Sequence, residues 1–303
     1  MRVPLAFGTS ALYNPMQTNL QHRNRRMRQV LSIQSSVAHG HVGNSAAVFA
    51  LERLGCAVVR VDTVRFSNHP AHGGFRGGAA PAGEIDALVN GVAERGFLSD
   101  CQAVLSGYLG TVENGLAVAR AVETVRKTAP AALFACDPVM GDDPKGLFVS
   151  GDIPLVMRDT LVPMADIVTP NRFELETLTG LPCDTREAVL NAAKAILNWG
   201  PSLVVVTGLR FARGQVETLA VTADAVLSVR HPLIDALAHG AGDTFAAIFL
   251  GRYLETPSPA RALSLAAASV AEILAKTDRD LALVEAQHAI VAPQNGEPAK
   301  ALE

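Results

Sequence analysis

The chain has 303 residues with a net charge of −3, and 49% of its residues are hydrophobic while only 5% are aromatic. This length suffices for one large α/β domain, and the composition is that of a chain with a well-filled core, which excludes intrinsic disorder. The slightly negative charge supplies no basic field for nucleic acid, and no stretch reaches the roughly 20 apolar residues of a membrane helix, so we expect neither partner.

The cysteines indicate the compartment. Cys56, Cys101, Cys136 and Cys183 stand far apart, and no CxxC pair occurs. This spacing argues against a disulfide framework or a zinc site and fits a reducing environment. We therefore expect a cytoplasmic protein.

Residues 1–26 are predicted to be a disordered N-terminal extension. Their composition is polar and turn-prone, and the basic cluster that starts at Arg23 follows a mixed segment instead of preceding an apolar core. That order is not the order of a secretory signal peptide. We expect residues 27–303 to form a single domain, and Met27 is a candidate for the true first residue.

From Gln29 onward, apolar strands alternate with segments of helical periodicity. Strands are predicted at residues 29–33, 57–66, 103–107, 132–139, 166–171 and 202–208, and helices at 43–55, 84–95, 113–128, near 153–160 and at 185–199. The alternation of strands with helices predicts βαβ units and a parallel sheet that is covered on both faces.

The last third of the chain follows a different pattern. Residues 218–231 predict an antiparallel strand pair with a turn at Ala223-Asp224, and three helices follow, one after Gly242, one at 258–277 and one at 281–291. The predicted fold is a doubly wound, mostly parallel sheet with helices on both faces. Such sheets bind ligands at the carboxyl ends of their strands.

Polar residues gather just past these predicted strand ends. Asp137 directly follows one strand, and Asn171 and Glu174 follow the next. Each has a simpler structural interpretation: Asp137 before a proline can shape a turn, and Asn171 can cap a helix with Glu174 completing a capping box. The pairs His39/His41 and His69/His72 lack a carboxylate or cysteine at ligand spacing, so metal binding by histidine is disfavoured.

The segment "HGAGD", residues 239–243, raises the most specific hypothesis. Gly240 and Gly242 flank Ala241, so the backbone N–H groups up to Asp243 can face one side, and the helix that follows adds partial positive charge. This arrangement favours an anion such as a phosphoryl group, and the same field keeps Asp243 ionised as a proton acceptor. The alternative is a helix-initiating turn with Asp243 as an acidic cap.

The remaining acids fit a magnesium–nucleotide complex. Asp137 and Glu174 are hard oxygen ligands of the kind that Mg²⁺ prefers, and they could bind it directly or through water. No GxxxxGK[ST] motif occurs, and no GxGxxG opens a helix after the first strand, which disfavours a P-loop and a dinucleotide site. Together these residues predict ATP-dependent phosphoryl transfer.

Several motifs resemble one family. "GAGD" with the helix after it, and Asn171-x-x-Glu174, resemble the ribokinase superfamily, while "SIQSSVAHGHVGNSAA", "VRFSNH", "AVLSGYLG" and "CDPVMGD" resemble the bacterial pyridoxal kinases, in order from about Val30 to about Ile290. The resemblance implies phosphorylation of the 5′-hydroxyl of pyridoxal by ATP, with pyridoxamine and pyridoxine as further candidates, to give pyridoxal 5′-phosphate in vitamin B6 salvage. It also implies Mg²⁺, K⁺ near the ATP, and a homodimer.

The resemblance assigns roles to matching positions. Asp243 resembles the catalytic base, next to Gly240, Ala241 and Gly242; Ser35 resembles a residue that hydrogen-bonds the pyridine ring; and Tyr108 resembles a tyrosine near a mobile lid. For ATP it implies the acids Asp137 and Glu174, a nucleotide contact at Thr169, and an adenine pocket lined by His231, Pro232, Leu233 and Ile234.

The sequence differs from the family pattern at two places. Pro70 and Ala71 follow "FSNH" where many relatives carry a substrate-touching threonine, so only their backbone is left for that contact. Thr207 stands at a nucleotide position where some relatives carry lysine, which removes a positive charge. A lid is expected in the Gly-rich segment around 69–83 or in the loop after Tyr108.

Three other functions compete with this interpretation. A hydroxymethylpyrimidine kinase would share the chemistry and the GxGD turn. A non-catalytic carrier or sensor of pyridoxal phosphate would be expected to lose the "GAGD" turn or the Asn171/Glu174 pair, and both are present. A dinucleotide oxidoreductase lacks its glycine fingerprint.

Overall fold

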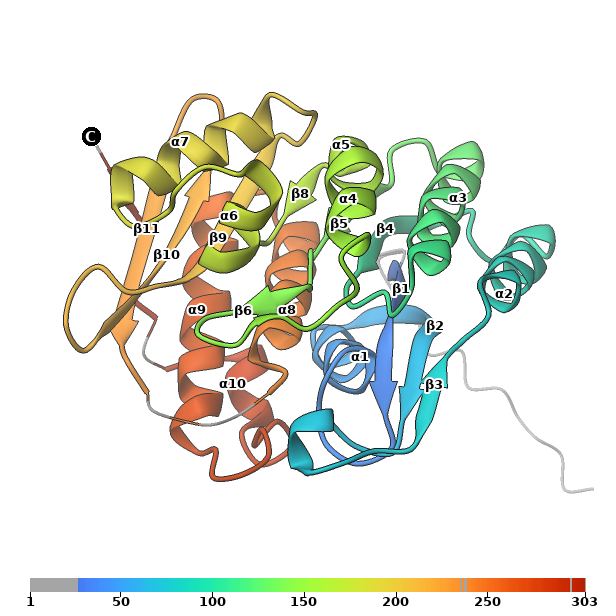
Figure 1. Cartoon of the computed structure of the whole chain (residues 1–303), viewed down its shortest axis with the longest axis horizontal. Helices are drawn as coiled ribbons and strands as arrows, with labels where there is room; N and C mark the ends of the chain where they lie inside the picture. Colours follow the sequence, from blue (N-terminus) through green and yellow to red (C-terminus); the bar gives the residue numbers. More distant parts are fainter. Residues whose placement is uncertain (1–26, 235, 237–238, 295, 303) are drawn as a thin grey trace, which may run out of the picture.

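The computed structural model describes residues 27–234, 236, 239–294 and 296–302. The predicted extension at 1–26 lies outside these residues. Within them, one sheet of ten strands runs through the molecule in the order β12-β11-β10-β9-β8-β5-β4-β1-β2-β3 (Figure 1). Its strands are β1 (Arg28–Val37), β2 (Cys56–Phe66), β3 (Gly77–Ala79), β4 (Cys101–Ser106), β5 (Leu133–Cys136), β8 (Ile167–Val168), β9 (Leu203–Leu209), β10 (Gln215–Val221), β11 (Val226–Pro232) and β12 (Lys300–Ala301).

The centre of the sheet is parallel and its edges are antiparallel. Strands β2, β1, β4, β5, β8 and β9 pair in parallel, whereas β3 pairs antiparallel with β2, and β10, β11 and β12 continue antiparallel from β9. The predicted mostly parallel, doubly wound sheet is therefore confirmed, and the six parallel strands present their carboxyl ends at one edge.

Helices cover both faces of the sheet. They are α1 (Asn44–Arg53), α2 (Ala82–Glu94), α3 (Val112–Thr128), α4 (Ile153–Val156), α5 (Val162–Met164), α6 (Arg172–Thr179), α7 (Arg186–Leu197), α8 (Ala241–Glu255), α9 (Pro259–Ala275) and α10 (Gln287–Val291), with a 3-10 turn at Pro70–His72 and a π-helical turn at Met157–Leu161. Helices α1, α8, α9 and α10 share one apolar cluster, and α2 to α7 share the other.

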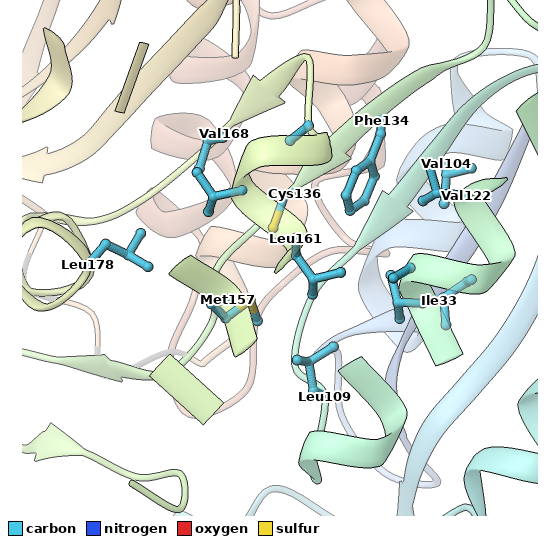
Figure 2. Packing of buried hydrophobic residues seen from close by; sticks show 14 of the residues in the cluster. Ile33, Val104, Leu109, Val122, Phe134, Cys136, Met157, Leu161, Val168 and Leu178 are labelled. Atoms are coloured by element: carbon cyan, nitrogen blue, oxygen red, sulfur yellow. The ribbon is translucent and has the colours of Figure 1, made fainter. Parts of the chain in front are cut away.

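The strand pattern explains these two cores. Along β1, Val30 belongs to the cluster under α1 and α8, while Leu31 and Ile33 belong to the cluster under α2 and α3, because successive strand side chains point to opposite faces. Figure 2 shows the second cluster, where Phe134 and Met157 pack among aliphatic side chains. The central strands are buried on both sides, as their continuous apolar runs predict.

The structure corrects several predicted boundaries. The last helix spans only Gln287–Val291, because residues 283–286 form turns, and the Ala282 N–H before them donates to Thr277 Oγ1 at 3.1 Å. The helix expected near 153–160 runs on to Met164 through the π-helical turn. Helix α8 begins at Ala241 and not after Gly242.

Some short elements were not predicted. These are β3, β12 and a hairpin formed by β6 (Gly141–Asp142) and β7 (Gly146–Leu147). They consist of two or three residues and carry no apolar alternation, so only their tertiary pairing creates them.

All four cysteines are buried free thiols. Among the described residues, no helix is both long enough and apolar enough to span a bilayer.

Candidate active site

The predicted site residues lie along the carboxyl edge of the parallel strands. Tyr108 follows β4, Asp137 follows β5 and Thr169 follows β8. Ser35 is among the last three residues of β1. Hydrogen bonds join these loops directly: the Thr169 hydroxyl donates to Asp137 Oδ1 at 2.8 Å. Residues that are far apart in sequence therefore meet at one rim, as the strand pattern predicts.

Asp137, Glu174 and Asp243 form a cluster of acids. Asp137 and Glu174 are only 5% and 4% exposed. Burial, and then the charge of Asp243, raise the pKa of Asp137 to about 8, although the hydrogen bond from Thr169 acts against this increase. Burial and the charge of Asp137 likewise raise the pKa of Glu174 well above its usual value. Ionised together, these carboxylates repel one another, and a bound cation would offset that repulsion.

The cluster fits a hard divalent cation with few protein ligands. Among the described residues, no group of three or more His, Cys, Asp or Glu side chains is arranged to hold a metal. Asp142 Oδ1, in the β6–β7 hairpin, is also buried without a hydrogen-bond partner. A Mg²⁺ ion here would be held by one or two carboxylates and complete its shell with water and phosphate oxygens, which is its usual mode in kinases.

The "HGAGD" turn forms the start of α8. Gly240 is the N-cap, with φ 95° and ψ 0°, a left-handed conformation that suits glycine. The amides of Ala241, Gly242 and Asp243 fall in the first helical turn, where N–H groups have no intrahelical partner. These three donors and the positive end of the helix therefore lie in the same turn as the Asp243 carboxyl.

Two features of the environment of Asp243 shift its pKa in opposite directions. Burial raises its pKa, and the backbone N–H of Gly43 opposes that increase by hydrogen bonding to the carboxylate. Gly43 precedes α1, so the first turns of two helices meet at this side chain. Burial favours the neutral form of Asp243, whereas the Gly43 N–H favours the ionised form, which is the form that can accept a proton.

The capping interpretation of Asn171 and Glu174 is confirmed as a structural fact. The Asn171 side chain accepts from the Glu174 N–H at 2.9 Å, and Glu174 accepts from the Asn171 N–H at 2.9 Å. Glu174 also accepts from the Met140 N–H at 3.2 Å. The same carboxylate therefore holds the start of α6 and borders Asp137, so a structural role and a nucleotide role are compatible.

Thr207 lies beside this cap. Its N–H donates to Pro170 O at 2.9 Å, and it forms an isolated bridge with Asn171. The structure therefore places Thr207 within β9, beside the capping box of Asn171 and Glu174.

The substrate side is formed by loops after β1, β2 and β4. Tyr108 is half-buried, burial raises its pKa, and its ring centroid lies 6.3 Å from that of Phe148. Pro70 and Ala71 are exposed in the short 3-10 turn, where the Ala71 N–H donates to His69 Nδ1 at 3.2 Å. This hydrogen bond engages the Ala71 amide, so that particular backbone group is not free for a substrate.

A stacked histidine pair ties the loop after β2 to the "HGAGD" turn. The rings of His69 and His239 lie 3.7 Å apart with an interplanar angle of 17°. His39 and His72 each lie beside Asp280, at 3.4 and 3.5 Å. These histidines line a small recess with His41 and Leu281 at the mouth of the site.

A second, larger cavity of about 280 Å³ lies between β11 and α9. His231, Pro232 and Ile234 line it, opposite alanines of α9 such as Ala267 and Ala271. Leu233 is not among its lining residues and is 38% exposed. The small side chains of α9 leave a flat apolar slot, the type of surface that a planar base can fill.

Three features of the site were not predicted from the sequence. They are the Gly43 amide at Asp243, the His69–His239 stack, and Lys145 at the tip of the β6–β7 hairpin, whose charge acts on both histidines. Gly43 before a helix was a visible signal, but its partner lies 200 residues later in the chain. Contacts of this kind depend on the tertiary arrangement of α1 and α8.

Sequence and structure comparisons agree with this geometry. A family profile described as phosphomethylpyrimidine kinase matches residues 89–287. Among curated relatives, the chain is 49% identical over 272 residues to pyridoxal kinase PdxY of Rubrobacter xylanophilus, covering 87% of this chain and 94% of that protein. It is 42% identical to the pyridoxal kinase PdxY of Corynebacterium diphtheriae, covering 88% and 96%.

Solved structures give the same result. The pyridoxal kinase of Leishmania donovani in complex with ADP and pyridoxamine superposes with a TM-score of 0.85 at 28% identity, over 91% of this chain and 100% of that chain. The pyridoxal kinase of Trypanosoma brucei superposes with a TM-score of 0.81 at 29% identity, over 91% and 99%.

Proposed function

The chain belongs to the pyridoxal kinase family, and on this premise we propose that it uses Asp243 to phosphorylate the 5′-hydroxyl of pyridoxal with ATP. The enzyme is a phosphotransferase with an alcohol acceptor, and it produces pyridoxal 5′-phosphate in vitamin B6 salvage.

One observation carries the residue-level proposal: the first turn of α8 holds a carboxylate and free amide donors side by side. In-line phosphoryl transfer needs a group that takes the proton of the attacking hydroxyl and donors that stabilise charge on the transferred group. Asp243 serves the first need, and the amides of Ala241, Gly242 and Asp243 serve the second. A helix cap alone would not require the neighbouring cluster of acids.

Asp137 and Glu174 are proposed to bind Mg²⁺ with the ATP phosphates. The raised pKa values of this cluster support the proposal, because a cation would offset the repulsion that raises them. The metal would supply charge neutralisation at the phosphates. Thr169 keeps Asp137 oriented through its hydroxyl. Family membership also leads us to propose K⁺ near the nucleotide.

The nucleotide base is proposed to occupy the slot between β11 and α9. His231, Pro232 and Ile234 form one wall and the alanines of α9 form the other. On the acceptor side, Ser35 would bind the pyridine ring, and it is 9% exposed at the end of β1. Tyr108 would contact the substrate from the loop after β4.

Three broader proposals rest on the family and the composition. We propose that the enzyme is a cytoplasmic homodimer, and that residues 27–303 form one catalytic domain. Size-exclusion chromatography with light scattering would measure the oligomeric state, and a monomeric mass would contradict the dimer.

A coupled kinase assay tests the function. Pyridoxal, pyridoxamine, pyridoxine and hydroxymethylpyrimidine should be compared side by side with ATP, and the account predicts the highest kcat/KM for a B6 vitamer. A preference for hydroxymethylpyrimidine would favour the activity named in the family profile. Binding of pyridoxal phosphate without any turnover would support a carrier or sensor.

A further inference from the structure

Helices α1 and α8 pack against each other (Figure 1). The N–H of Gly43, the N-cap of α1, hydrogen-bonds Asp243 in the first turn of α8, so the two helices meet at their starts. At the opposite ends of the pair, a Cβ on Gly251 would lie 2.7 Å from Leu54 Cδ1, so the helices approach closely there. Arg28 joins the same ends by donating to Gly251 O at 2.8 Å and to Leu54 O at 2.5 Å. The two helices therefore run in the same direction, and any shift of α1 is transmitted to α8.

At the site end, two glycines let backbone pack directly on backbone. A Cβ on Gly240 would lie 1.8 Å from His41 O, so the "HGAGD" turn rests on the loop that precedes α1. A Cβ on Gly43 would lie 2.1 Å from Ser35 O and 2.5 Å from Ser35 Oγ. Gly43 thus touches the proposed substrate residue Ser35 on one side and faces the proposed base Asp243 on the other.

Asn44 fixes the position of Gly43. It is the first residue of α1 and is 1% exposed. Its side-chain amide donates to Val61 O and to Asp62 Oδ1, both at 2.9 Å, and its Oδ1 accepts from Ser32 Oγ at 2.8 Å. Because these partners belong to β1 and β2, one side chain ties the start of α1 to two strands of the sheet.

Ser45 adds a second tie. Its hydroxyl donates to Val37 O at 2.8 Å and accepts from the Val37 N–H at 3.1 Å, which closes the loop between β1 and α1. The loop is therefore held at both ends by backbone and side-chain hydrogen bonds within the protein.

We propose that Asn44 and Gly43 are positioning residues for the base: they hold the first turn of α1 so that Asp243 keeps its orientation toward the acceptor hydroxyl. The inference deepens the proposed function and rests on the role of Asp243 in it. Since a misplacement of about 1 Å can cost roughly 100-fold in rate, the loss of this support should appear in kcat.

A double-mutant cycle separates positioning from general stability. Asn44→Ala should lower kcat about tenfold or more, while the KM for ATP stays within about threefold, because the nucleotide slot lies elsewhere. In an Asp243→Asn background the same substitution should change kcat by less than about twofold, since no base remains to be positioned.

Asn114→Ala is the matched control. Asn114 is equally buried, also lies in the first turn of a helix, and its side-chain amide donates to Thr63 O at 3.1 Å and to Leu109 O at 3.0 Å, away from the "HGAGD" turn. Both alanine variants should lower the Tm, but only Asn44→Ala should show a kcat loss that disappears in the Asp243→Asn background. If Asn44→Ala does not fold, Ser45→Ala should be taken through the same cycle, with a kcat loss of about threefold or more expected.

The outcomes are distinct. An equal loss of kcat in both backgrounds, or a lower Tm with unchanged kcat, would overturn the positioning role. Full turnover of the single variant Asp243→Asn would overturn the role of Asp243 as the base. That result would contradict the proposed function itself, and it differs from each result that contradicts only the positioning role. A loss confined to the background that retains Asp243 supports the inference.

Discussion

The stacked pair His69–His239 predicts that acid weakens the closure of the substrate loop. Burial, the neighbouring histidines and Lys145 lower the pKa of His69 from 6.5 to about 4, and burial and Lys145 lower the pKa of His239. Asp142 acts in the opposite direction on His239. Two rings 3.7 Å apart therefore stack as neutral groups, and protonation of either ring opposes the stack.

The dependence of loop closure on pH follows from the difference in the pKa of His69 between the closed and the open loop. When the loop opens, His69 regains an ordinary pKa near 6.5, so the open state binds a proton that the closed state does not. Closure is fully favourable above about pH 6.5 and is lost progressively as the pH falls toward about 4. The upper limit is about 3 kcal/mol, and partial solvent exposure of the loop reduces it to roughly 1–2 kcal/mol.

The assay compares the KM for pyridoxal between about pH 5 and 8 in wild type and in His69→Phe. Phenylalanine can stack on His239 but cannot take up a proton, so its KM should rise less than that of wild type at acid pH. The protection factors of the amides within residues 69–76, which correct for intrinsic exchange at each pH, should fall more at low pH in wild type than in the variant. Identical pH profiles for KM in the two proteins would refute the reasoning.

Two further predictions concern other parts of the chain. Removal of residues 1–26 should leave Tm and kcat unchanged, and a large drop in either would contradict a dispensable extension. Asp137→Asn should raise the Mg²⁺ concentration needed for half-maximal activity by about tenfold or more, because a carboxylate ligand is lost; it should not lower the Tm, since the repulsion with Asp243 and Glu174 disappears. An unchanged Mg²⁺ requirement would remove Asp137 from the metal site.

The fold class could be predicted because it depends on local periodicity. Buried strands such as β5 and β9 contain continuous apolar runs. The N-caps of α3, α7 and α9 are Thr111, Thr185 and Ser258, each of which caps its helix through a hydroxyl. Where the pattern was weak the prediction failed: the "GGA" segment of β3 has no apolar alternation, and it is a strand only because it pairs with β2.

Those parts of the candidate site that have short sequence motifs could be predicted in the same way. The "HGAGD" turn, Asp137 and Glu174 carry their chemistry in short motifs, and the strand order brings them to one rim. The capping box of Asn171 shows that a structural interpretation and a functional one can both hold for the same residues. The Gly43–Asp243 contact could not be predicted, because no local pattern indicates that the first turns of α1 and α8 meet.

The most direct test of the account is the substitution Asp243→Asn. Asparagine retains the shape of aspartate, and no cap is lost, because the N-cap of α8 is Gly240 and the helix has no side-chain cap hydrogen bond. The substitution also removes the charge that raises the pKa of Asp137, so the Tm should not fall. The base is lost, and kcat should therefore fall by about 10² to 10⁴, with ATP and pyridoxal still binding. Turnover above roughly a tenth of wild type would contradict the role of Asp243 as the base and with it the interpretation of the "HGAGD" turn.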